Sequence, residues 1–90
     1  MKVKRSTKFQ ENIGLRILFL RNKLGWSQTQ LGKACNIDHS TIGKYEKDEI
    51  SIGAQCLQDI IEALGVDAIK FFRSGLFATA TRQPVLYKNK

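Results

Sequence analysis

The stretch from Leu24 to Glu46 reads LGWSQTQLGKACNIDHSTIGKYE, and it carries the start and stop signals of two short helices. Ser27, with Gln30 three residues later, gives the S-x-x-Q pattern of a capping box, in which two side chains bind backbone N–H groups that a first turn leaves unpaired. Asn36 tolerates the left-handed backbone that ends a helix. We therefore predict a helix between Ser27 and Asn36. Its inward positions are expected to be Leu31 and Ala34.

A second helix is expected directly after this stop signal. Asp38 is a favoured N-cap residue, and Ile42 and Tyr45 are spaced three apart, which places them on one face of a helix. We expect that face to turn inward and the other face to meet solvent. The outward residues are then His39, Ser40, Gly43 and Lys44.

Helical periodicity also marks the chain on both sides of this pair. Residues 9–24 and 53–64 repeat apolar side chains at helical spacing, Gly65 ends the second of these segments, and Asp67 caps a final short helix. The chain thus predicts an all-α, five-helix bundle. The inward residues are expected to be Ile13, Ile17, Leu20 and Leu24, then Leu57, Ile60, Ile61 and Leu64, then Val66 and Phe71 as a hydrophobic staple in a segment that Gly75 closes.

The two ends of the chain differ from the helical region, which we bound at 9–75. Residues 1–8 are rich in Lys and Arg and hold no acid, so we expect a flexible basic arm. Residues 76–90 are β-prone and are interrupted by Pro84. They are expected to form either a short strand or a disordered tail.

The first helix has a second apolar face. Leu15, Leu18 and Phe19 lie nearly opposite the inward stripe, where a surface helix normally carries polar residues. Three such side chains would form a sticky patch. We expect the tail or a second subunit to cover them, with the tail at least partly ordered and packed on this helix or forming the dimer contact.

Composition limits the classes of function. The 90 residues suffice for one small domain, and the net charge of +7, with 15 Lys and Arg against 8 Asp and Glu, favours a polyanionic partner. No apolar run approaches the roughly 20 residues that span a bilayer, and no signal peptide is visible, so we expect a cytoplasmic protein without a membrane partner. Cys35 and Cys56 lack metal-binding spacing, and no catalytic constellation is present, so neither metal, cofactor nor enzymatic activity is expected.

Several weak motifs agree in their spacing over residues 13–72. They are Ile13-Gly14, Arg16-Ile17, Leu20-Arg21, Gly25, Ser27-Gln28, Leu31, Ile37, Ser40-Thr41-Ile42, Tyr45-Glu46 and Ala63-Leu64-Gly65-Val66. In this pattern the chain resembles the phage-repressor and Cro-type (XRE-like) helix-turn-helix DNA-binding proteins. The resemblance implies five helices in this order, with the second helix of the pair, residues 38–46, in the major groove of DNA.

The resemblance also implies roles for single residues. The base-reading residues are expected to be His39, Ser40 and Lys44, on the outward face of the second helix. The phosphate-binding residues are expected to be Ser27, Gln28, Thr41 and Lys47, because helix N-termini attract anions, with a base edge as the other target for Gln28. Arg21 and Glu46 are expected to form a partly buried ion pair that holds the second helix to the scaffold.

Four residues carry further information beside this pattern: Trp26, Gly43, Asp48 and Glu49. Gly43 stands where the family often has a larger polar residue, so it either removes a base-reading side chain or lets the helix approach DNA closely. Asp48-Glu49 replaces the usual glycine and basic residue, so the loop turns away from phosphate or the affinity is modest. Trp26 is expected to be a hydrophobic plug rather than a base-stacking platform.

The sequence therefore predicts a regulator of transcription that binds double-stranded DNA sequence-specifically. We expect a homodimer that represses, because a chain without a visible effector domain regulates most simply by blocking a promoter. Two other functions remain open. One is an antitoxin-like module that binds a protein partner as well as DNA, and the other is a nonspecific chromosome-coating protein.

Overall fold

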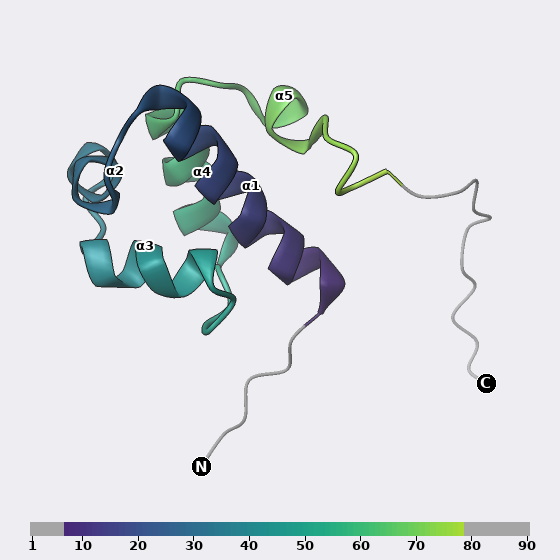
Figure 1. The fold of residues 1–90 in the computed structure, drawn as a ribbon, viewed down its shortest axis with the longest axis horizontal. Coiled ribbons are helices and arrows are strands. Elements are labelled where there is room, and N and C mark those ends of the chain that lie inside the picture. Colours follow the sequence, from purple (N-terminus) through teal and green to yellow (C-terminus); the bar gives the residue numbers. More distant parts are fainter. Residues whose placement is uncertain (1–6, 79–90) are drawn as a thin grey trace, which may run out of the picture.

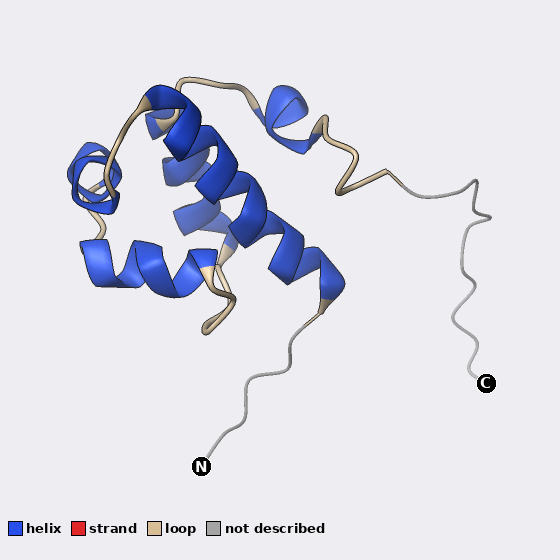
Figure 2. Ribbon diagram, viewed as in Figure 1, coloured by secondary structure: helices blue, strands red, loops and turns tan. Residues whose placement is uncertain are grey.

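The computed structural model of the chain describes residues 7–78, and its secondary structure consists of helices joined by short loops (Figures 1 and 2). The elements are α1 (Lys8–Leu24), α2 (Gln28–Cys35), α3 (His39–Glu46), α4 (Ala54–Ala63) and α5 (Ala68–Phe72). The predicted all-α, five-helix order is confirmed, and no strand occurs within the described range. Most of the expected arm 1–8 and tail 76–90 lies outside the described residues.

Local capping explains where the helices begin. The Thr7 hydroxyl accepts a hydrogen bond from the Gln10 backbone N–H, so α1 starts at Lys8 and takes in the last residue assigned to the arm. The capping box of Ser27 and Gln30 is complete, with both reciprocal hydrogen bonds present. The other predicted caps are also confirmed: Asp38 and Asp67 accept from backbone N–H groups at the starts of α3 and α5, and Asn36 ends α2 at φ 59°.

The core forms where α1, α3 and α4 meet, with single residues from α2 and α5. It contains Ile13, Ile17, Leu20, Leu31, Ile42, Tyr45, Ile52, Ile60, Ile61, Leu64 and Phe71. Leu24 was expected on the inward stripe of α1 but is 46% exposed. It is the last residue of that helix, and the chain turns away at the left-handed Gly25, so the stripe reaches the surface there.

Ala34 was also expected to face inward, and it is exposed. The buried face of α2 instead passes through Leu31 and Gly32 to the half-buried Cys35. At Gly32 a Cβ atom would lie 2.3 Å from the Ile37 carbonyl oxygen, so the following turn folds back onto the helix at this point. Ala34 lies beside this buried face, on the exposed side of α2.

A second close approach fixes α3 against α1. A Cβ atom at Gly14 would lie 2.3 Å from the carbonyl oxygen of Tyr45, near the C-terminal end of α3. Only a residue without a side chain fits between these backbones. Gly14 therefore sets the angle at which α1 supports α3.

A buried arginine joins α5 to α1. Arg16 is 9% exposed, and its Nε donates to the Phe71 carbonyl at 2.7 Å while its Nη2 donates to the Lys70 carbonyl at 2.9 Å. These carbonyls end α5 at Phe72, so the helix stops before the expected Gly75. Arg16 thus supplies the donors that a C-terminal turn needs.

The described start of the tail packs beside this junction as a turn. Asn12 donates to the Leu76 carbonyl at 2.9 Å. The ring centroid of Phe77 lies 5.8 Å from that of Phe9 and 4.9 Å from that of Phe72. The second face of α1 stays partly open, because Leu15 is 39% and Phe19 53% exposed, whereas Leu18 is half-buried. The cover expected over that face is not provided by residues 76–78.

Candidate nucleic-acid interface

The interface is built from α2, the turn after it and α3, which stand on one side of α1 while α5 stands on the other (Figure 1). The N–H of Ile37 donates to the Gly32 carbonyl at 2.8 Å, and Asn36 is left-handed, so the chain reverses within a few residues. Asp38 then starts α3. This geometry is that of a helix-turn-helix unit, in which α2 and α3 pack on each other.

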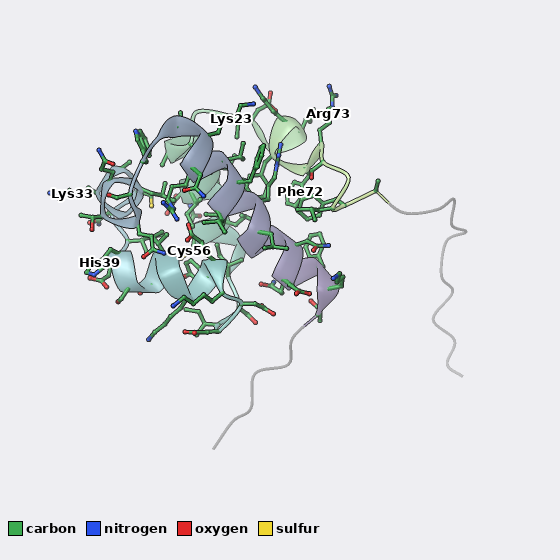
Figure 3. All side chains as sticks on the ribbon, in the orientation of Figure 1. Lys23, Lys33, His39, Cys56, Phe72 and Arg73 are labelled. Atoms are coloured by element: carbon green, nitrogen blue, oxygen red, sulfur yellow. The ribbon has the colours of Figure 1, made fainter. Side chains whose placement is uncertain are left out.

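One edge of α3 carries the exposed polar side chains. His39, Ser40, Lys44 and Lys47 are exposed, and Thr41 is half-buried. Figure 3 shows His39 at the outer N-terminal end of α3, well away from Arg73 beside α5. Near the start of α2, Ser27 is exposed while Gln28 is half-buried. The structure thus places most of the expected DNA-contacting residues on the surface, and Gln28 and Thr41 partly beneath it.

The ion pair expected between α1 and α3 is present and lies inside the domain. Arg21 Nε donates to Glu46 Oε2 at 2.6 Å, and Arg21 Nη2 donates to Glu46 Oε1 at 3.0 Å. The two side chains are 10% and 4% exposed. Arg21 also donates to the Trp26 carbonyl at 2.7 Å, so one guanidinium joins α3 to the loop before α2. A planar, bidentate contact of this kind fixes direction as well as distance.

Gly43 was expected to face outward, and it is buried. The atoms nearest to the position of a Cβ there are Gln28 Oε1 at 3.2 Å and Gln28 Nε2 at 3.3 Å. The amide of Gln28 therefore lies over Gly43, and its Nε2 donates to Glu46 Oε1 at 3.0 Å. The sequence offered two explanations for Gly43, the loss of a base-reading side chain or a close approach of the helix to DNA. Neither of them included a side chain from α2 lying over this glycine.

Ser40 has a partner within the protein. Its backbone N–H donates to Asp38 Oδ2 at 2.9 Å, and its hydroxyl donates to the same oxygen. These two bonds lower the pKa of the Asp38 carboxyl below its ordinary value, since both favour the charged form. The Ser40 hydroxyl proton is thus used in capping α3, which leaves its oxygen as an acceptor toward a base.

The loop after α3 contains a strained position. Asp48 has φ 59°, in the left-handed region where glycine is favoured. The N–H of Glu49 donates to the Lys44 carbonyl at 2.8 Å, which closes the last turn of α3. The aspartate at the usual glycine position was visible in the sequence, but its left-handed backbone was not predicted. The aspartate adopts the glycine conformation.

The phenol of Tyr45 is buried and the thiol of Cys35 is half-buried in this part of the domain. Burial, together with Cys56, raises the pKa of Tyr45 to about 12, and burial raises the pKa of the Cys35 thiol. Both groups therefore stay protonated at neutral pH. Within residues 7–78 no group of three His, Cys, Asp or Glu side chains could hold a metal ion, and no helix is long and apolar enough to cross a membrane.

The fold and this surface define a helix-turn-helix domain: a short helix with an exposed polar and cationic edge, held by a second helix and a buried ion pair. Comparison with known proteins agrees. A family model described as helix-turn-helix matches residues 17–71, and the chain belongs to that family.

Curated relatives and solved structures extend the comparison. Two uncharacterized HTH-type transcriptional regulators, from Sinorhizobium medicae and Rhizobium meliloti, are each 41% identical over 61 residues, which is 68% of this chain and 44% of the relative. The chain thus spans less than half the length of these relatives. The crystal structure of the restriction-modification controller protein C.Esp1396I is similar in fold, with a TM-score of 0.69 and 24% identity over 76% of this chain and 86% of that one.

Proposed function

We propose that this chain regulates transcription by binding double-stranded DNA sequence-specifically, with α3 in the major groove. The observation that carries the proposal is the exposed edge of α3, whose polar and cationic side chains project from a helix fixed by the Arg21–Glu46 pair. A helix of this width fits the major groove, where base edges present distinct donor and acceptor patterns. The net charge of +7 favours the same polyanion.

The position of each residue along α2 and α3 suggests which part of the DNA it contacts. His39, Ser40 and Lys44 are assigned to base edges, with Lys44 donating to guanine and Ser40 accepting through its oxygen. Ser27 at the N-terminus of α2, Thr41 on the flank of α3 and Lys47 at its end are assigned to phosphates that border the groove. Gln28 belongs to this second group by position at the α2 N-terminus. Its amide also donates to Glu46 Oε1 of α3 at 3.0 Å.

The proposal includes a homodimer, and the structure offers a surface for it. An apolar groove of about 560 Å³ lies between α4 and α5 and is lined by Leu57, Ile61, Val66 and Phe72 among others. Beside it Ile69 is 69% exposed. A two-fold interface needs a projection and a matching hollow on the same surface, and this patch has both. It also leaves α3 free, which a dimer on two half-sites requires.

We propose further that the protein represses transcription by blocking a promoter. We place it in the cytoplasm and assign it no enzymatic activity. The antitoxin-like alternative has one observation in its favour, the exposed Leu15 and Phe19 of α1, which a protein partner could cover. Purification from the native host distinguishes the two. A stoichiometric small protein held through α1, and released by Phe19→Lys, would favour the alternative, whereas a homodimer alone favours the regulator.

Selection from a pool of random DNA duplexes tests the proposal. We expect enrichment of a palindrome whose half-sites lie about one helical turn, roughly 34 Å, apart. The selected duplex should bind at least about 1,000 times more tightly than a scrambled duplex at physiological salt. Equal affinity for both duplexes, with a steep loss on adding salt, would instead indicate the nonspecific coating protein.

A further inference from the structure

We propose that the outer face of α1 docks an acidic amphipathic helix of a second protein. This outer face consists of Leu15, Leu18 and Phe19, and Lys23 follows Phe19 one turn further along the helix. Leu15 and Phe19 are exposed, and Leu18 is half-buried. The inference goes beyond the proposed DNA binding and does not depend on it.

The apolar side chains of the outer face fit a helix better than a nucleic acid. Leu15, Leu18 and Phe19 are spaced three and four residues apart, which gives a row along α1 against which a second helix can pack. Two cations already lie over the Phe19 ring, the Arg16 guanidinium at 5.5 Å and the Lys23 ammonium at 5.9 Å from its centroid. These cations occupy the place that a stacked base would need, and a base offers little aliphatic surface to the two leucines.

Cations border the outer face toward α5. Arg16, which contacts the Phe19 ring, also donates to the Arg73 carbonyl at 3.5 Å, so α5 ends beside this face. Figure 3 shows Lys23 and Arg73 on this side of the molecule, away from Lys33 on α2. Both side chains are exposed, and within residues 7–78 no carboxylate forms an ion pair with either. An apolar face with such a positive rim complements Asp and Glu side chains.

Charge disfavours the covers that this chain itself could supply. Residues 1–6 contain three Lys or Arg and residues 79–90 contain three more, and neither segment holds Asp or Glu. A two-fold contact between copies uses the same patch twice, so it would set one positive rim against the other. The complementary charge must therefore come from another protein.

The place of the outer face limits what this partner does. The α3 helix and α5 stand on different sides of α1 (Figure 1), so a helix docked beside α5 leaves the exposed edge of α3 free. The partner thus joins the DNA-bound protein instead of displacing it. Exposed charge pairs are individually weak, so the partner is expected to bind reversibly, unlike the stoichiometric small protein that an antitoxin would hold.

Titration of the isotope-labelled full-length protein with synthetic peptides, followed by NMR, tests the proposal. The probe is an amphipathic helical peptide of about 18 residues, with Leu along one face and Glu on both flanks. Its counterpart carries Lys in place of every Glu. The acidic peptide should shift the backbone amides of Leu15, Phe19 and Lys23, and the Lys peptide should bind at least about tenfold more weakly.

Two variants separate the contributions of charge and apolar contact. Lys23→Glu should weaken the acidic peptide about threefold and strengthen the Lys peptide, whereas Lys33→Glu on α2 is the matched control and should change neither. Leu15→Glu should weaken the acidic peptide at least about tenfold, with a melting temperature within about 5 °C of the wild type. Should Leu15→Glu fail to fold, Lys23→Glu decides the matter.

Four results would overturn the proposal. One is that the acidic peptide does not bind, and another is that both peptides bind alike or that Lys23→Glu changes nothing. A single-stranded oligonucleotide that shifts the same α1 amides when the peptide does not would assign the face to nucleic acid. A Leu15→Glu variant that is monomeric where the wild type is dimeric would assign it to a second copy.

Discussion

At the scale of single residues, the Arg21–Glu46 pair is the contact on which the position of α3 depends most directly. Both groups are buried, so removing one leaves the other without its partner in a poorly solvated site. We expect Arg21→Ala to destabilise the domain by about 3–5 kcal/mol, measured by thermal unfolding without DNA. Lys23→Ala is the matched control, because the ammonium of Lys23 only lies over the exposed ring of Phe19. Equal melting temperatures for the two variants would show that the pair contributes nothing.

The N-cap of α3 should make stability depend on pH in the acid range. Hydrogen bonds from Ser40 lower the pKa of Asp38 from its ordinary value of 3.8 in the folded state. Its contribution is therefore complete above that value and is lost as the pH falls through the lowered folded pKa. Asp38→Asn keeps a capping side chain without the charge, so its melting temperature should fall less steeply below about pH 4. Parallel curves for wild type and variant would contradict this assignment.

At the scale of elements, α5 is joined to the domain through Arg16. Replacing this arginine with methionine keeps an apolar stem but removes the donors to the Phe71 and Lys70 carbonyls. We expect Arg16→Met to cost about 1–3 kcal/mol, because the buried Phe71 carbonyl and the part-buried Lys70 carbonyl lose this partner. In Arg16→Met, the backbone amide hydrogens of α5 should exchange with solvent faster than those of α3. Lys23→Met serves as the control, and unchanged protection of the Phe71 amide in Arg16→Met would mean that α5 is held in another way.

The sequence predicted the elements well because their boundaries are set by neighbouring residues. Thus the capping box at Ser27, the left-handed Asn36 and the Asp67 cap needed no knowledge of distant contacts. Exposure was less predictable, since the packing of α2 on α3 and α4 decides which of its residues turn inward, and a side chain of α2 covers Gly43. A periodic pattern shows which residues share a face, whereas the packing of the turn at Gly32 or the amide of Gln28 decides what that face meets.

In the candidate interface, too, neighbouring residues predict some features and contacts between distant residues decide others. The outward position of His39, Ser40 and Lys44 follows from helical spacing, so the sequence sufficed to place them. The partners of Arg16 lie 54 to 57 residues further along the chain, and nothing local signals them. In the sequence Arg16 stands out as a charged residue within an otherwise apolar turn of α1 and as part of the family pattern, but neither signal names its partners.

At the scale of the whole molecule, two apolar surfaces compete as the dimer contact: the groove between α4 and α5, and the exposed face of α1. Ile69→Lys places a charge on the first and Phe19→Lys on the second. We expect only Ile69→Lys to yield a monomer in sedimentation equilibrium, with weaker binding to a palindrome because the two half-sites are no longer linked. A dimeric Ile69→Lys together with a monomeric Phe19→Lys would move the contact to α1.

The central claim is that the outer edge of α3 reads sequence, and binding to matched and mismatched duplexes tests it most directly. For Lys44→Ala and His39→Ala we expect discrimination between the selected site and single-base variants to fall by about 1–3 kcal/mol per lost contact. Lys47→Ala should instead weaken binding to every duplex alike and reduce the salt slope by about one. If Lys44→Ala and His39→Ala lower affinity equally for all duplexes, α3 does not read bases and the account is wrong.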